Sequence, residues 1–261
     1  MKRIFPTFIA TTLVLSGLCF SQIKNVGAST RSGLASVQAR ASSIRFAARF
    51  IRGANGRRRY TIKAKYPQAV GTGAARLVKL NQVITDLITK EVNQFKKEAG
   101  PPEGPRLTSI SSFESDYTVG LATGDLVSIS LFINTYFEGA AHGLDRTVVL
   151  NYDLSSGRVL KLADLFKPKS NYLKLISDYS IKAIKEELGA DADNDWIQRG
   201  AEATEENYKN WNITRKGLEI YFERYQVAPY VTPPPDIVIP YGDLKNVIDP
   251  AGPLARVAGK Q

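Results

Sequence analysis

The chain has 261 residues, a formal net charge of +10 and 10% aromatic residues. A chain of this length can bury a sizeable core in one large domain or two small ones. Its single cysteine, Cys19, excludes a fold held by disulfides within the chain, so stability must come from that core. One histidine and one cysteine supply too few ligands for a zinc site, and we expect no metal and no cofactor.

Residues 1–28 have the layout of a secretory signal peptide. A basic start, Met1-Lys2-Arg3, precedes a mostly apolar run, and Val26-Gly27-Ala28 offers a site for a signal peptidase. The apolar run is shorter than the roughly 20 residues that a membrane helix needs. We therefore expect cleavage after Ala28 and a protein that is exported, periplasmic or secreted. A retained membrane anchor and an organelle transit peptide are the alternatives.

Residues 29–56 are expected to form a basic, flexible leader. The first 85 residues contain fifteen Lys or Arg and no acid, whereas the remainder contains 20 basic and 25 acidic residues. Arginines among Ser, Ala and Gly are typical of a solvated linker, or of an arm that binds an anionic polymer or membrane surface. We predict that Arg57, Arg58 and Arg59, at the end of this arm, bind such a surface. Export makes nucleic acid an unsuitable partner.

Regular structure is expected from residue 57 onward. Alternation in RRYTIKAKYP predicts a strand that ends at Pro67. Apolar residues at three- and four-residue steps from Leu77 to Phe95 predict a long amphipathic helix, which Gly100 ends. Residues 57–105 are thus predicted to form a small N-terminal β-α part.

Residues 106–250 are predicted to form a C-terminal α+β domain, followed by a tail over 251–261. Alternating runs on both sides of Thr123-Gly124-Asp125 predict a β-hairpin, and two further strands flank the DLSSG turn. Residues 170–189 predict a second amphipathic helix, and Asp195 is the predicted N-cap of a third. Helices and hairpins follow one another in blocks rather than in β-α-β order. The predicted fold is therefore α+β, with a largely antiparallel sheet and packed amphipathic helices.

Four blocks of sequence resemble, in their order, the family called domain of unknown function 3298. They are YFEGAAHG, NYDLSSGRVLKLADLF, GLEIYFERYQVAPY and IVIPYGDL, the last ending at Leu244. The upstream YTIKAKYP, with the helix after it, is similar to the small domain that precedes this one in the peptidoglycan deacetylase PdaC and the anti-sigma factor RsiV. Because the extracytoplasmic part of RsiV binds lysozyme, the resemblance implies an extracytoplasmic binding or sensing module.

The lone histidine, His142, lies between an aromatic strand and a tight turn. A serine-histidine-aspartate triad is not indicated, because no G-x-S-x-G motif is present. General acid–base catalysis with Glu138, Asp145 or Asp153 is one hypothesis, since these carboxylates cluster near it in the sequence. Contact with a ligand and a purely local structural role are the other two.

The segment ERYQVAPYVTPPPD, residues 223–236, predicts a surface recognition loop. Its prolines and two tyrosines form a stiff amphipathic ridge. The residues predicted to bind a ligand or partner are Tyr136, His142, Tyr225, Tyr230 and Pro234.

These features favour an exported monomer that binds a cell-envelope protein or glycan, such as a lysozyme-like protein or peptidoglycan. Two alternatives stay open. One is a cell-envelope hydrolase that uses His142 with a carboxylate. The other is a structural envelope protein that the basic arm holds on anionic polymer or membrane.

Overall fold

The computed structural model describes residues 44–71, 74–100, 109–189 and 192–258, all within one compact unit that spans 41–261. The predicted signal peptide and the first part of the predicted leader, through residue 43, lie outside the described residues. None of the helices in the described ranges combines the length and the apolar character needed to cross a membrane.

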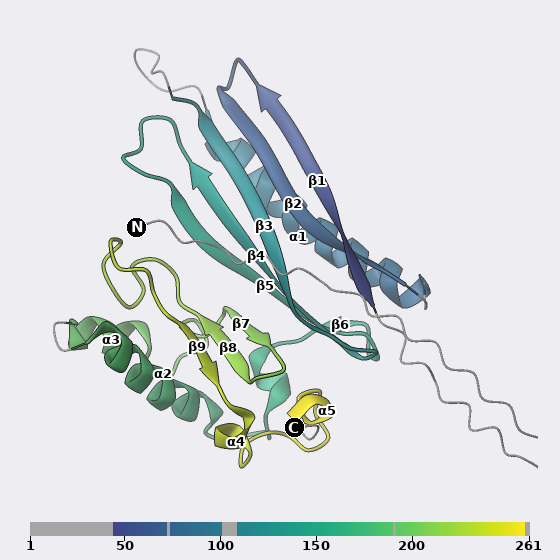
Figure 1. Ribbon diagram of the computed structural model, residues 1–261, viewed down its shortest axis with the longest axis vertical. Helices are drawn as coiled ribbons and strands as arrows, with labels where there is room; N and C mark the ends of the chain where they lie inside the picture. The colour runs from purple at the N-terminus through teal and green to yellow at the C-terminus, as the bar shows by residue number, and fades with distance from the viewer. Residues whose placement is uncertain (1–43, 72–73, 101–108, 190–191, 259–261) are drawn as a thin grey trace, which may run out of the picture. The chain divides into compact units, whose positions relative to one another are not determined.

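A six-stranded sheet with the order β1-β2-β3-β4-β5-β6 dominates the fold (Figure 1). Its strands are β1 (Arg45–Asn55), β2 (Tyr60–Val70), β3 (Ser111–Ala122), β4 (Leu126–Tyr136), β5 (Leu144–Asp153) and β6 (Arg158–Val159). Every neighbouring pair is antiparallel except β2 and β3. The predicted α+β class with a largely antiparallel sheet is confirmed, and the predicted hairpin at Thr123-Gly124-Asp125 joins β3 to β4.

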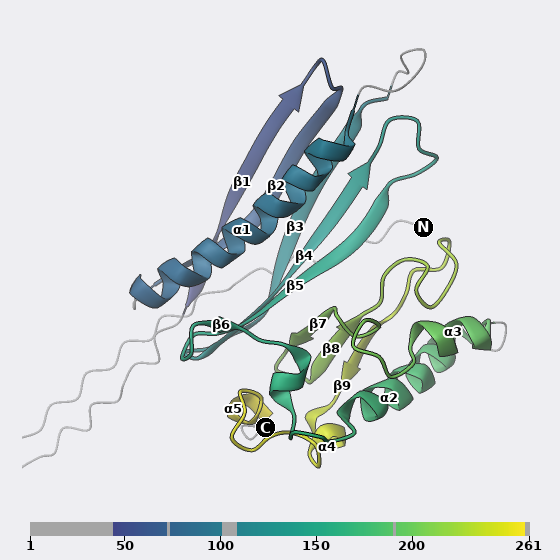
Figure 2. The same ribbon diagram turned by 180° about the vertical axis from the view of Figure 1, so that it is seen from behind.

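The parallel pair is connected by α1 (Ala74–Glu98), which lies along one face of the sheet (Figure 2). β2, α1 and β3 therefore form a β-α-β unit, so the prediction that this order is absent is wrong at this connection. The helix forms as predicted, because its apolar residues recur on one side. They pack against sheet residues such as Ile62, Phe113, Ile129 and Leu131, and their buried members are Leu77, Leu80, Ile84, Ile88, Val92 and Phe95.

β1 corrects the prediction that residues 29–56 form a flexible leader. It pairs with β2 along its whole length, from Arg45 opposite Val70 to Asn55 opposite Tyr60. Phe46 and Ile51 pack against the apolar cluster beneath α1. Composition concealed this strand, because arginines suit the exposed positions of an edge strand as well as they suit a solvated linker.

β2 continues past Pro67, where the sequence predicts its end. The ladder with β3 stops at Ala64, so a proline beyond that point interrupts no hydrogen bonds on that side. Asn81 of α1 takes over the role of a neighbouring strand there. Its side-chain carbonyl accepts from Ala69 N at 2.7 Å, and its amide donates to Ala69 O at 2.9 Å.

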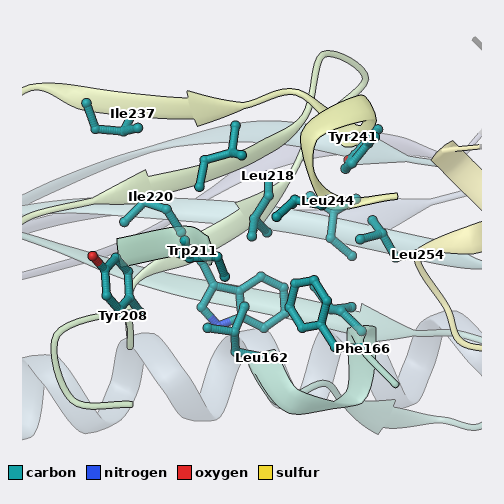
Figure 3. Close-up of a cluster of buried hydrophobic side chains, with 14 of the residues drawn as sticks. Leu162, Phe166, Tyr208, Trp211, Leu218, Ile220, Ile237, Tyr241, Leu244 and Leu254 are labelled. Atoms are coloured by element: carbon teal, nitrogen blue, oxygen red, sulfur yellow. The ribbon is translucent and has the colours of Figure 1, made fainter. Parts of the chain in front are cut away.

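The chain after the large sheet builds a second core around a three-stranded antiparallel sheet. Figure 3 shows Trp211, Phe166 and Tyr208 gathered in this core with the aliphatic side chains around them. Its elements are η1 (Leu162–Leu165), α2 (Tyr172–Leu188), α3 (Asn194–Gly200), β7 (Trp211–Ile213), β8 (Leu218–Tyr221), β9 (Asp236–Ile239), α4 (Tyr241–Leu244) and α5 (Ala255–Ala258).

Two local predictions in this part need correction. The N-cap of α3 is Asp193 rather than Asp195, because Asp193 has an extended backbone and its carboxylate accepts from Trp196 N at 2.9 Å. The predicted tail over 251–261 is not a mere extension, since it contributes α5 and the fully buried Leu254.

Along the chain, the change from one apolar cluster to the other falls near residue 160. The sequence predicts the domain boundary elsewhere, between residues 105 and 106. The cluster beneath α1 draws its buried members from 62–154, and the other draws on 160–254 together with Leu121 and Leu126. The predicted boundary falls inside the large sheet, because β2 and β3 are neighbours there. Hydrophobic periodicity indicates elements but not which strands pair across a helix.

A chain that begins at Gly56 should unfold at a clearly lower temperature than a chain that begins at Ser42. Removing β1 takes Phe46 and Ile51 out of the cluster, which we expect to cost about 2–4 kcal/mol of unfolding free energy. Thermal unfolding followed by circular dichroism measures the difference. Equal melting temperatures would show that residues 45–55 behave as the flexible leader that the sequence predicts.

Candidate functional site

A groove of about 610 Å³ opens between the large sheet and two segments near β8 and β9. Its floor is the sheet face opposite α1. In β4 the residues that face α1 include Ile129 and Leu131, so the alternating Ser128, Ser130 and Phe132 point to the other face. The facing wall comes mostly from the two ends of the predicted recognition ridge (residues 223–236), and its lining residues are Tyr221, Phe222, Glu223, Arg224, Pro233, Pro234 and Asp236.

Strand register places a row of polar side chains across the groove floor. Glu114 of β3 lies opposite Asn134 of β4, which lies opposite Asp145 of β5. Register partners point to the same face, so these three groups share the floor. Asn134 donates to Asp145 Oδ1 at 2.7 Å, and Lys63 of β2 is 3.3 Å from Glu114. The carboxylates remain half exposed and free to accept further hydrogen bonds from a ligand.

A second row contains the aromatic centre of the floor. Asp116 lies opposite Phe132, which lies opposite Thr147. Phe132 is 38% exposed, although it stands on a face that is otherwise polar. Tyr221 of the wall meets it edge-on, with ring centroids 6.4 Å apart and planes at 77°. Lys65 pairs with Asp116 at 2.8 Å, and this hydrogen bond lowers the pKa of the Asp116 carboxyl. The row therefore offers an open apolar patch between polar groups.

Tyr221 joins the wall to the sheet. Its hydroxyl accepts from Ser130 Oγ at 3.1 Å and donates to Glu219 Oε2 at 2.8 Å. Asn212 Nδ2 also donates to Ser130 Oγ. Burial raises the pKa of the Tyr221 phenol well above its ordinary value, and the hydrogen bond to Glu219 raises it further. Tyr221 is therefore a neutral, immobile part of the wall at physiological pH.

The hydrogen bonds of Ser130 belong to a seam of buried polar side chains between the two sheets, and this seam continues at Ser128 and Asn151. Ser128 Oγ donates to Asn151 Oδ1 at 2.6 Å and accepts from Ile213 N at 2.9 Å. Asn151 Nδ2 donates to Trp211 O at 2.6 Å. These bonds attach β7 to the same face of β4 and β5 that forms the groove floor.

His142 and Tyr230, both predicted to bind a ligand, are brought together next to the groove, to which Arg224 connects them. Their rings stack, with centroids 3.9 Å apart and planes at 22°, and Tyr230 Oη donates to Gly143 O at 2.9 Å. Arg224 Nη1 donates to Tyr230 O at 2.7 Å, and the guanidinium lies 4.9 Å from the Tyr230 ring centroid. Because Arg224 also lies 3.5 Å from Asp145, this cluster is continuous with the groove.

The other predicted binding residues divide between this region and a distant one. Tyr225 is 49% exposed and its ring lies 5.6 Å from that of Tyr230. Pro234 lines the groove. Tyr136 does not join them, since its hydroxyl donates to Ser109 Oγ at 3.2 Å before the start of β3.

Two of the three carboxylates of the catalytic hypothesis, Glu138 and Asp153, are held in buried ion pairs. The Glu138 side chain is 2% exposed and receives Arg59 Nε at 2.8 Å. Asp153 is also buried, and it pairs with Arg256 at 2.9 Å. β5 separates His142 from Asp153 by roughly 30 Å, because ten extended residues intervene. His142 and Asp153 therefore cannot act together as an acid–base pair.

The three arginines predicted to bind an anionic surface have different surroundings. Arg59 is 17% exposed, pairs with Glu138 and donates to Ser109 O at 2.9 Å, so its prediction as part of a solvated arm is wrong. Arg58 donates to Lys97 O at 3.3 Å. Arg57 is exposed.

Sequence reasoning missed Phe132, Asn134 and Arg224 as site residues. A signal for Phe132 was present, since a large aromatic interrupts the polar alternation of Ser128, Ser130 and Asn134 in β4. Arg224 gave no such signal, because its partners come from other segments of the chain.

The sequence and the fold are similar to those of known proteins. Residues 163–242 match the family described as "Protein of unknown function (DUF3298)", so the chain carries a DUF3298 domain there, and the predicted resemblance to this family is confirmed. The likeness to RsiV in particular stays a prediction.

Among curated proteins, the peptidoglycan-N-acetylmuramic acid deacetylase PdaC of Bacillus subtilis (strain 168) is 28% identical over 170 residues. The match covers 65% of this chain and 36% of the deacetylase, so the chain spans little more than a third of that relative.

Two solved structures share the fold. A DUF3298 family member from Bacteroides fragilis NCTC 9343 has a TM-score of 0.64 at 18% identity, over 85% of this chain and 99% of that one. A DUF3298 family protein from Pseudomonas aeruginosa PAO1 has a TM-score of 0.55 at 17% identity, over 80% and 94%.

Replacing Asp153 with Asn should destabilise the protein at neutral pH by about 1–3 kcal/mol, because Arg256 loses a charged partner. Burial raises the pKa of Asp153, but the hydrogen bonds from Arg256 and Ser155 N outweigh burial and hold the pKa below its ordinary value. The carboxylate thus stabilises the fold above about pH 4, and this contribution disappears as the pH falls through the folded-state pKa. Urea unfolding from pH 7 to pH 2 should show the two proteins converging in acid. A pH-independent difference would assign the effect to packing instead.

Proposed function

We propose that this protein is an extracytoplasmic binding module whose groove holds a glycan chain of the cell wall. The observation that carries the proposal is the exposed Phe132 ring between the Glu114–Asn134–Asp145 row and the Tyr221 wall. A sugar ring presents C–H groups that pack on an aromatic face, and hydroxyls that donate to carboxylates and amides. Binding sites commonly combine such an apolar surface with a few fixed polar groups.

The similarity to PdaC supports a cell-wall target. That relative is named for its action on N-acetylmuramic acid in peptidoglycan, and it shares 170 aligned residues with this chain. A module that belongs with such an enzyme would hold the same polymer outside the cytoplasm. The deacetylase reaction itself is not part of the proposal.

The side chains of the site favour binding over hydrolysis. Glu138 and Asp153 are committed to Arg59 and Arg256, so neither is open to a substrate. His142 is exposed, stacks on Tyr230 and contacts its own neighbour, Gly143 O, through Nδ1 at 2.9 Å. An exposed imidazole on a tyrosine ring suits contact with a ligand at the groove end.

A protein partner is the second candidate, and the exposed middle of the predicted recognition ridge supports it. Val231 is 86% exposed and Tyr225 is 49% exposed. Both lie on a proline-rich segment that the bond from Arg224 to Tyr230 O holds in place. Stiff, exposed apolar side chains are the kind that anchor a protein interface, because little conformational entropy is lost on binding. A lysozyme-like protein remains the partner to test.

Phe132→Ala should weaken binding of soluble peptidoglycan fragments by about tenfold, since loss of one stacked aromatic contact costs about 1.4 kcal/mol. Isothermal titration calorimetry with purified fragments measures the affinity. The matched control is Phe50→Ala, which removes another half-exposed phenylalanine outside the groove. Full affinity in Phe132→Ala, or an equal loss in both variants, would contradict a groove site. Release of sugar products during the titration would support the hydrolase alternative.

Val231→Asp should abolish or weaken by at least about tenfold any binding to lysozyme, because it places a charge at the most exposed apolar position of the ridge. Surface plasmon resonance with immobilised lysozyme measures this. Val159→Asp, at a half-exposed valine on β6, is the control and should bind unchanged. If lysozyme binds both variants alike, the ridge is not its contact surface.

A further inference from the structure

Part of the positive charge of this protein lies on a folded edge and has no acidic partner. The name β1 edge stands here for a set of exposed or half-exposed cations. They belong to β1, to the turn after it and to the end of α1. They are Arg45, Arg49, Arg52, Arg57, Arg58, Lys96 and Lys97. Within the described residues none of them forms an ion pair, whereas Lys63 and Lys65 of the next strand both do.

The geometry of the β1 edge is linear. β1 is the outermost strand of the sheet and pairs only with β2 among the described strands, so its outer main-chain groups have no strand partner. Eleven extended residues span roughly 35 Å. Arg45 lies opposite Val70 and Arg49 opposite Tyr66, so these two arginines share one face of the edge, whereas Arg52, opposite Lys63, points to the other face. Arg58 continues the line to α1, where it donates to Lys97 O at 3.3 Å.

We propose that the β1 edge is a second binding surface, for a linear phosphate polymer. One guanidinium group can bind two phosphate oxygens at once. An extended row of cations without acidic partners also matches a regularly charged anionic chain in both sign and shape. The edge is separate from the proposed glycan site, since none of its cations lines the groove.

The side chains of the β1 edge favour contact with phosphate groups over contact with nucleic-acid bases or with a lipid membrane. The exposed phenylalanine of the strand, Phe50, lies beneath Arg52, with the guanidinium carbon 4.4 Å from the ring centroid. A base would need that face for stacking, and a membrane would need the ring free to insert. The contacts are therefore electrostatic and fall with salt.

Fluorescence anisotropy with end-labelled inorganic polyphosphate tests the proposal on the full chain at 50 and 200 mM NaCl. The variant Arg45→Gln/Arg49→Gln/Arg52→Gln should bind at least about tenfold more weakly, and its plot of log affinity against log salt should be flatter by about 2. The matched control is Lys185→Gln/Lys216→Gln/Lys245→Gln, which removes the same charge from exposed lysines elsewhere. The control should keep most of the affinity. If the arginine variant fails to fold by circular dichroism, Arg57→Gln/Lys97→Gln replaces it, with an expected loss of about threefold or more.

Three results would overturn the proposal. Equal losses in the arginine and lysine variants would show an unspecific effect of net charge. Binding to phosphatidylglycerol vesicles without binding to polyphosphate would assign the edge to a membrane. Absence of polyphosphate binding with aggregation of the arginine variant would show that the arginines only protect an open strand from pairing with another chain.

Discussion

A seam of buried hydrogen-bonding side chains holds the small sheet on the large one, and the groove depends on it. Ser128, Ser130 and Asn212 are fully buried, and Asn151 is nearly so. Leaving such a group without a partner costs about 1–3 kcal/mol, which favours the arrangement in which Ser128, Ser130 and Asn151 meet their partners. Tyr221 belongs to the seam through Ser130 and to the groove wall through its ring. The position of the wall over Phe132 is therefore set by buried polar contacts and not by apolar packing alone.

The same alternation in β4 serves both halves of this arrangement. Small hydroxyls at Ser128 and Ser130 allow β7 and β8 to approach the sheet closely, and two positions further Phe132 is left open. A large side chain at Ser130 would push Tyr221 away and widen the groove. The proposed binding site is thus a region of the sheet face that the second core leaves open, next to a region that the second core covers.

The sequence predicted the elements that depend on local pattern and missed those that depend on distant partners. The apolar steps of α1 and the turn at Thr123-Gly124-Asp125 are local, and the structure contains both. The pairing of β1 with β2 and the parallel β2–β3 ladder are not local, so arginine-rich β1 resembled a linker. In the site, His142 and Tyr230 were predicted separately, but their stacking joins segments that only the fold brings together. Glu138 and Asp153 attracted a catalytic hypothesis by proximity in sequence, and their ion pairs could not be predicted from it.

Locating a bound peptidoglycan fragment on the protein tests whether a cell-wall glycan binds in the groove over Phe132. Backbone amide shifts of isotopically labelled protein can be followed by NMR during titration with a purified peptidoglycan fragment. A glycan bound in the groove should cause the largest shifts at Phe132, Asn134 and Asp145, with smaller ones at the wall residues around Tyr221. Shifts confined to the ridge at Val231 or to β1, or no shifts at saturating concentrations of fragment, would contradict binding in the groove.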